Sequence, residues 1–467
     1  MSNVWAVARQ MIAEGLRMKI AVVFLVLMAL LLLGLPFSVS GDSSQAGAVQ
    51  GFLSYALRAS GLLLGMLTIF LSRSLSDELV NKQILMLMTK PLPRWQYILG
   101  KWLGITVLNF VFLSFVGICV YGMVYVIQWR NPALTSYDAV VLKKQVLVAR
   151  HGLKPEVPDF ETPAEREFQQ NLEQGLYDDE LSLTPEEERS RLKNKYEARW
   201  RVVEPLGARE FEFKNVLCDR SQKNELQLRY RTNVSRPPPD EIYRCGWVFG
   251  DPLKGTAVYT TPVRHVIDRI HTVRFPADAV AEDNTLKVTF YNQNPYPDEP
   301  LFQTVFEFRK GDGPDLFFVV GSFWANLFRL LVLMQCKLMF LAAVAIFATT
   351  ILSYPVACLV SFTVYVIAGA RAFIQESLFL ADSGKDGWFE TVKEIFYATF
   401  STVFAVLQWI VPDFTRYDGV ETLVSGKNVS LVWVLQGVGD LAVLKTVIIL
   451  GLAMLAFHRR EVAEVSL

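Results

Sequence analysis

The sequence lacks the motifs that phosphate, acyl-transfer and metal chemistry use. The Gly-Lys pairs that begin at Gly100, Gly384 and Gly426 are each followed by a residue without a hydroxyl group, so none completes a P-loop. No G-x-S-x-G elbow and no H-E-x-x-H helix is present. The 4 histidines are scattered, and the 5 cysteines include no C-x-x-C pair. We therefore expect a chain that is not an enzyme and that binds no metal or cofactor of its own.

An excess of charge is absent as well. The 46 Lys and Arg residues balance the 46 Asp and Glu residues, and the formal net charge is +0. A nucleic-acid-binding protein usually carries a basic surface, so we expect no nucleic-acid partner. Charged residues make up only 20% of the chain and hydrophobic residues 52%. This composition indicates a membrane protein with a soluble part.

Long apolar runs supply the candidate membrane spans, since a helix needs roughly 20 apolar residues to cross a bilayer. We expect six spans, at residues 20–36, 51–71, 102–127, 330–352, 356–373 and 439–457. Residues 317–328 are predicted to approach the membrane along its interface. A seventh span would place the basic residues 458–460 outside, against the positive-inside bias, so residues 388–411 are predicted to form re-entrant outer helices.

The predicted fold is an α-helical polytopic membrane protein with both termini in the cytoplasm and an inserted α+β extracytoplasmic domain. The expected parts are an interfacial amphipathic helix (1–19), spans one to three (20–128), the insertion (129–315), an interfacial segment with spans four to six (316–457), and a cytoplasmic tail (458–467). The basic residues before the first apolar run also fit a cleaved signal peptide. We favour a retained anchor, because further spans follow.

The insertion changes its pattern along its length. Thr-Pro pairs at Thr162 and Thr184, each followed by glutamate, predict helices at 163–176 and 185–200. Apolar and polar residues then alternate at 211–213, 226–230, 286–290 and 306–308, which predicts half-buried strands and a β-sandwich. Such a sandwich can bind a ligand or brace neighbouring subunits, and no residue decides between the two. If this region lies outside the cytoplasm, Cys218 and Cys245 are candidates for a disulfide.

A polar loop at residues 73–101 separates the second and third spans. Its basic residues outnumber Asp77 and Glu78, which places the loop in the cytoplasm. Residues 78–88 have helix-forming composition, and the Lys90-Pro91-Leu92-Pro93 stretch ends that helix because proline disfavours helical geometry before it. The sequence therefore predicts a short helix beneath the membrane that can receive a push from a soluble partner.

This order of features resembles the cytoplasmic loop of permease subunits of type-2 ABC exporters. The resemblance rests on the Asp77-Glu78 pair, the apolar run before Lys90-Pro91, the Pro93-Arg94-Trp95 turn and the Leu99-Gly100-Lys101 start of the next helix. In that family the short helix is the coupling helix, which docks on a separately encoded ATP-binding subunit. The long insertion departs from the minimal family pattern and resembles the enlarged permeases grouped with copper-enzyme maturation and gliding-type exporters, which leaves the cargo open.

The resemblance implies a location in the cell (inner) membrane, a homo- or heterodimer of permease subunits, and ATP and Mg bound by the partner ATPase. It also implies an ATPase contact made by Asp77, Glu78, Lys82, Lys90, Pro91 and Arg94.

Basic residues inside the apolar runs are the remaining unusual feature, because a charge at mid-span costs roughly 2.5 to 3.5 kcal/mol on insertion scales. Arg58, Lys337 and Lys445 are candidates to line a path for an anionic or amphipathic cargo. The alternative is anchoring at the outer headgroups, which we consider for Arg329, Arg371 and Lys445.

The expected function is that of a permease subunit of an ATP-binding-cassette transporter, an exporter driven by a separate ATPase. One alternative is a membrane-anchored extracytoplasmic binding, sensory or assembly protein without transport activity. A membrane enzyme is a third, but it needs titratable residues clustered at one depth.

Overall fold

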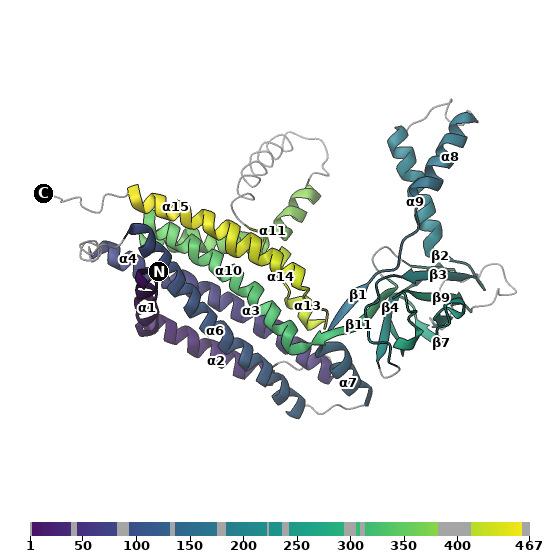
Figure 1. The fold of residues 1–467 in the computed structure, drawn as a ribbon, viewed down its shortest axis with the longest axis horizontal. Coiled ribbons are helices and arrows are strands. Elements are labelled where there is room, and N and C mark those ends of the chain that lie inside the picture. The colour runs from purple at the N-terminus through teal and green to yellow at the C-terminus, as the bar shows by residue number, and fades with distance from the viewer. Residues whose placement is uncertain are drawn as a thin grey trace. The chain divides into compact units, whose positions relative to one another are not determined.

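The computed structural model describes residues 2–38, 44–81, 93–130, 136–174, 184–221, 224–235, 242–293, 305–308, 313–381 and 412–459. Two compact units make up the chain, Met1–Ala149 with Gly321–Leu467, and Arg150–Val320. We call the first the membrane unit and the second the inserted unit (Figure 1). The inserted unit thus begins and ends later than the expected 129–315. The predicted outer helices at 388–411 and the tail from residue 460 lie outside the described residues.

Helices form the membrane unit. Their bounds are α1 Ser2–Arg17, α2 Lys19–Ser38, α3 Gln45–Leu71, α4 Arg73–Val80, α6 Arg94–Arg130, α7 Ser136–Val141, α10 Phe323–Ile351, α11 Tyr354–Ala381, α13 Val420–Val424, α14 Leu431–Gly437 and α15 Thr446–Arg459. A π-helical turn, Val438–Lys445, joins α14 to α15 without a break. Among the described residues, six helical stretches are long and apolar enough to cross a membrane, as the sequence predicts.

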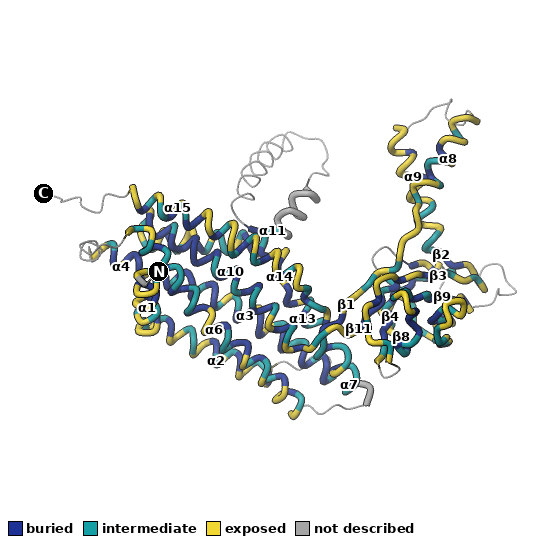
Figure 2. The backbone as a smooth tube through the Cα atoms, in the orientation of Figure 1, coloured by how far each residue is buried: buried dark blue, intermediate teal, exposed yellow. Residues whose placement is uncertain are grey.

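Helix α10 is the most enclosed of these stretches. In its most apolar window 78% of the residues are buried within the protein, against 22% in α2 (Figure 2). Helices α3, α6, α11 and α15 pack around α10, whereas α2 presents most of its apolar surface outward.

All six candidate spans begin earlier than predicted, and for the fourth and the last the difference changes the assignment of the preceding segment. Residues 317–328, predicted to approach the membrane along its interface, are divided between the strand Asp315–Ser322 and the start of α10 at Phe323. The last span begins at Leu431 rather than at residue 439. In both cases a serine caps the new start: the side chain of Ser322 accepts a hydrogen bond from the Ala325 amide, and that of Ser430 from the Trp433 amide.

Helix α1 packs on protein rather than presenting its whole apolar face to lipid. Val7 and Met11 of α1 are buried. A Cβ atom added at Gly100 of α6 would lie 2.6 Å from Val7, and one added at Gly104 would lie 2.6 Å from Met11. The two glycines allow α1 and α6 to approach closely, so one face of α1 packs into the helical core. Its location at the membrane interface stays a prediction.

The inserted unit is built on two four-stranded sheets, β1-β11-β4-β8 and β3-β9-β6-β7, and one small sheet, β2-β10-β5. The strands are β1 Val148–Leu153, β2 Val202–Val203, β3 Ala208–Phe213, β4 Glu225–Arg231, β5 Asn233–Val234, β6 Ile242–Phe249, β7 Tyr259–Val266, β8 Ile270–Pro276, β9 Leu286–Asn292, β10 Phe306–Glu307 and β11 Asp315–Ser322.

Aromatic side chains join the two larger sheets. The rings of Phe249 on β6 and Phe275 on β8 stack with centroids 3.9 Å apart, and those of Tyr230 on β4 and Trp247 on β6 lie 4.8 Å apart. All four side chains are buried. The four strands that the alternation predicts are present, and the shared core fits the expected β-sandwich.

A helical hairpin lies in the chain between β1 and β2. It consists of α8, Glu161–Glu173, and α9, Pro185–Arg201, close to the predicted ranges. The predicted capping box at Thr184 and Glu187 is formed. Helix α8 starts earlier than predicted, because Asp159 rather than Thr162 accepts hydrogen bonds from the first amides of the helix.

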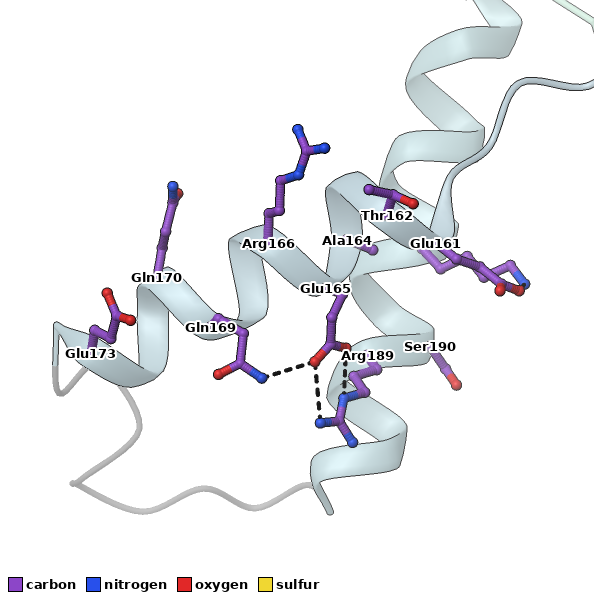
Figure 3. Close-up of a pocket in the computed structure, with 11 residues that line it drawn as sticks. Glu161, Thr162, Ala164, Glu165, Arg166, Gln169, Gln170, Glu173, Arg189 and Ser190 are labelled. Atoms are coloured by element: carbon purple, nitrogen blue, oxygen red, sulfur yellow. Dashed lines mark hydrogen bonds and ion pairs between the residues drawn. The ribbon is translucent and has the colours of Figure 1, made fainter.

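Ion pairs hold the two helices of the hairpin together. Glu165 on α8 points toward both Gln169 and Arg189, and its carboxylate lies 2.8 Å from the Arg189 side chain (Figure 3). These groups line an open hollow of about 860 Å³. The Glu165 and Arg189 side chains are 46% and 44% exposed, so we interpret the hollow as a solvated helix face rather than a site.

Candidate functional site

A buried ionic cluster ties together the helices at the two ends of the polar loop, residues 73–101. The Lys101 Nζ atom on α6 donates to Glu78 Oε1 on α4 at 2.7 Å, to Ser74 Oγ on α4 at 2.9 Å and to Glu14 Oε2 on α1 at 3.1 Å. Only 1% of the Lys101 side chain is exposed. Together with Tyr97 these residues form what we call the loop-base cluster. It links three helices at the end of the membrane unit where α4 ends and α6 begins (Figure 1).

Helical spacing explains why these residues meet. Ser74 and Glu78 are four residues apart on α4, and Tyr97 and Lys101 are four residues apart on α6, so each pair shares one helix face. The Tyr97 hydroxyl donates to the Glu78 carboxylate, and the Tyr97 ring stacks on Phe457 of α15 with centroids 5.8 Å apart. The last helix therefore also rests on the cluster.

Glu14 carries the more accessible carboxylate of the cluster, with 33% of its side chain exposed. Burial acts to raise its pKa, but the charge of Lys101 and hydrogen bonds from Ser74, Gln10 and Lys101 outweigh burial and lower the pKa overall. Glu14 is thus held ionised beside the Lys101 ammonium group.

The residues predicted for the ATPase contact have different environments. Asp77 is exposed and pairs with Arg73 at 3.2 Å. Glu78 is buried and turned inward. Arg94 donates through Nη1 to the carbonyl oxygen of His458 at 2.7 Å and to that of Phe457 at 3.3 Å, at the carboxyl end of α15.

The remaining predicted contact residues, Lys82, Lys90 and Pro91, lie outside the described residues, as does most of the predicted helix 78–88. Within that range, α4 continues through Val80. The contact itself stays a prediction. Because the Glu78 side chain is buried, it would act by holding the base of the loop rather than by touching a partner.

A cavity of about 340 Å³ lies within the membrane unit, and we call it the membrane cavity. Its lining comes from α3, α10, α11 and residues 414–420, namely Leu57, Arg58, Gly61, Leu62, Met66, Met334, Lys337, Leu338, Phe362, Tyr365, Val366, Gly369, Phe414, Thr415, Asp418 and Val420.

Two of the three predicted path cations, Arg58 and Lys337, meet at the membrane cavity. The Lys337 ammonium lies 5.8 Å from the centre of the Phe414 ring. Among the described residues, no carboxylate lies within ion-pair distance of Arg58 or Lys337. The Tyr365 hydroxyl donates to the Gly61 carbonyl at 3.2 Å and braces α11 against α3.

The third predicted path cation, Lys445, is not part of that cavity. It pairs with Asp440 at 3.5 Å in the π-helical turn and lines a separate hollow of about 520 Å³. Arg329, considered as a headgroup anchor, donates to the Asn428 side chain at 2.7 Å and to the Val429 carbonyl at 3.2 Å. It therefore holds the loop before α14.

Cys218 and Cys245 are free thiols, so the candidate disulfide is not formed in this structure. Cys245 is buried in the sandwich core, 3.8 Å from the Tyr230 hydroxyl, and burial raises its pKa to about 12.

The sequence reading missed a histidine pair in the same unit. His265 on β7 and His271 on β8 stack with ring centroids 3.8 Å apart, although the sequence shows them only as scattered residues. The Tyr230 hydroxyl lies 2.8 Å from His265 Nδ1. Within the described part of the chain, no three metal-ligating side chains gather into a group that could hold an ion.

No model of a known protein family matches this chain, and no curated protein shows significant similarity to it.

Proposed function

We propose that the chain is the permease subunit of a type-2 ABC exporter, which moves its substrate across the cell (inner) membrane with ATP hydrolysed by a separate subunit. Six candidate spans and the polar loop between the second and third of them support this function. On this proposal both termini and the loop face the cytoplasm, the inserted unit lies outside, and two permease subunits form a homo- or heterodimer.

The observation that carries the proposal is the loop-base cluster. A coupling loop must transmit movement from a soluble partner into the spans, and this requires a rigid connection at its base. Lys101 joins α4 and α6, which form the two ends of the loop, and also holds α1 through Glu14. Arg94 and Tyr97 add the end of α15. A push on the loop would therefore displace all four helices together.

The predicted contact residues have two different roles in this function. Asp77 is exposed and available to a partner, whereas Glu78 and Arg94 hold the loop base in place. ATP and Mg would bind to the ATPase subunit, which is a different chain.

Co-purification tests the proposal. The full chain is solubilised under mild conditions from its native host, and associated proteins are identified by mass spectrometry. We expect an ATP-binding subunit with the wild-type chain, its loss with Asp77→Lys, and its retention with Glu173→Lys, a matched charge reversal on exposed α8. Failure of the wild-type chain to retain any ATP-binding subunit would contradict the proposal.

The alternative function is that of a membrane-anchored binding protein in which the inserted unit binds the ligand. A hollow of about 450 Å³ in that unit, lined by Trp200, Glu210, Lys254 and Lys287 among others, favours it. On this alternative no ATPase subunit co-purifies with the wild-type chain, and Asp77→Lys does not change the set of associated proteins. The same co-purification therefore separates the two functions.

A further inference from the structure

The membrane cavity combines apolar walls with two cations. Its walls carry aliphatic, methionine and aromatic side chains, including Leu62, Met66, Met334 and Phe362. Its charged lining residues are Arg58, Lys337 and Asp418, which leaves one positive charge in excess. This lining matches a ligand that is apolar over most of its surface and carries a negative group at one end.

Lys337 has the environment of a ligand-binding cation. It sits at the middle of α10, the most enclosed apolar helix, where an ammonium group is expensive unless it meets an opposite charge. The face of Phe414 supplies a cation-π contact at 5.8 Å, and the Asp413 and Asp418 carboxylates attract the ammonium group only from beyond ion-pair distance. Lys445 provides the contrast, since its ammonium group lies 3.5 Å from the Asp440 carboxylate.

The size of the cavity is compatible with such a ligand. Small-molecule sites commonly measure about 300 to 1,000 Å³ and are mostly apolar with a few polar groups that fix orientation. The membrane cavity, at about 340 Å³, lies at the lower end of that range. It would hold the charged end of a ligand and the neighbouring part of an apolar chain.

We propose that the membrane cavity binds an amphipathic anion, with a carboxylate or phosphate at Lys337 and Arg58 and an apolar chain against α3, α10 and α11. Binding does not depend on the proposed function, whereas the identification of this ligand class as cargo rests on it. The ligand is either an anionic lipid of the surrounding bilayer or a free amphipathic molecule, and both share the same chemistry.

The test uses the purified full chain in nanodiscs of zwitterionic lipid, without any ATPase. Cis-parinaric acid, a fluorescent fatty acid, serves as the anionic probe, and its methyl ester as the neutral one. We expect saturable binding of the acid and binding of the ester weaker by about tenfold or more, equivalent to ~1.4 kcal/mol. Equal binding of acid and ester would overturn the proposal.

Variants assign the binding to this cavity. Lys337→Met should weaken binding of the acid by about tenfold. Lys445→Met removes a cation from the neighbouring hollow instead, and should change the affinity by less than about twofold. Lys337→Met that binds the acid as tightly as the wild type does would overturn the proposal.

A second variant that fills the cavity tests the proposal independently, in case Lys337→Met fails to fold. A Cβ atom added at Gly369, which lines the cavity, meets no other atom within 4 Å, so Gly369→Leu can fill the cavity without a backbone clash. Gly451→Leu on α15 is its match, because Gly451 also has open space. We expect Gly369→Leu to abolish probe binding and Gly451→Leu to preserve it. Unchanged binding by Gly369→Leu would place the probe elsewhere and overturn the proposal.

A competition arm distinguishes the two sources of the ligand. Adding anionic phospholipid to the nanodiscs should displace the probe if a membrane lipid occupies the site, and should leave it bound if the site selects free amphipaths. Because no ATPase is present, a failed binding test removes only the ligand assignment, and a failed co-purification removes only the transporter assignment.

Discussion

The Lys101 ammonium nitrogen lies 2.7 Å from Glu78 Oε1, and the two side chains are only 1% and 6% exposed. A buried ion pair of this kind is sensitive to the loss of one partner, because the remaining charge is left uncompensated. In this chain the pair joins the two helices that form the two ends of the predicted coupling loop.

Lys101→Met should be among the most destabilising substitutions at the loop base. It leaves the Glu78 and Glu14 carboxylates facing each other without a cation, and breaking a buried pair in this way costs about 3 to 5 kcal/mol. Glu78→Gln should cost less, because Glu14 still lies 3.1 Å from Lys101. Thermal unfolding of the detergent-solubilised chain measures both. An equal loss of stability in the two variants would show that Glu14 does not neutralise Lys101 when Glu78 is uncharged.

Gly104→Val should detach α1 from α6. Its added Cβ would lie 2.6 Å from Met11 Cβ and 2.9 Å from the Ala8 carbonyl oxygen, so backbone must shift. Overpacking of this type costs about 1 to 3 kcal/mol. The control is Gly122→Val on the same helix, where an added Cβ meets nothing within 4 Å. Limited proteolysis within α1 reports the detachment, and equal protection of the two variants would contradict the predicted packing.

Acidification should destabilise the inserted unit through His265. Burial, and then the charge of His271, lower the pKa of His265 from 6.5 to about 4. Between these values the unfolded chain binds more protons than the folded one, so stability is full above 6.5 and is lost as the pH falls toward 4.

Pulse proteolysis in urea at several pH values measures this loss as cleavage within residues 150–320. His265→Gln should flatten the pH dependence. His151→Gln is the control, since that imidazole lies outside the stacked pair and contacts the Phe318 ring instead. If the stability of the His265→Gln variant still falls with pH as in the wild type, a titratable group other than His265 causes the pH dependence.

Alkylation should find every cysteine as a free thiol. The chain has 5 cysteines, and those described in the structure include Cys218 and Cys245 without a bond. Intact-mass measurement after denaturing alkylation without reductant should therefore show five added groups. In the native chain Cys245 should react last, because it is buried and its pKa is raised to about 12. A mass lower than this by two alkyl groups would reveal a disulfide.

The sequence predicted those helices and strands that depend mainly on residues close to one another in the chain. The capping box at Thr184, the apolar runs of the spans and the alternation in β3, β4 and β9 all appear in the structure where they were expected. Strands β6 and β7 are among those that the sequence did not predict: β6 contains Gly246, and β7 contains Pro262, a residue that disfavours strand assignment. The two strands pair along Ile242–Phe249 and Tyr259–Val266. This pairing stabilises the strand conformation, which the local sequence does not favour by itself.

The loop-base cluster could not be predicted in the same way. Lys101 lies 87 positions from Glu14 and 23 from Glu78 in the chain, and the family resemblance assigned Glu78 to the ATPase contact rather than to a buried ion pair. The cavity was predicted only in part, because helical position identifies Arg58 and Lys337 as unusual but does not show that α3 and α10 bring them together.

The sharing of Lys101 between Glu14 and Glu78 has an evolutionary consequence. Two acids that serve one base are partly redundant, so a lineage can lose either acid and keep a neutralised lysine, whereas losing the lysine first leaves both carboxylates uncompensated. Chains descended from the same ancestor should therefore hold the basic position fixed while the acidic residue alternates between the first helix and the loop.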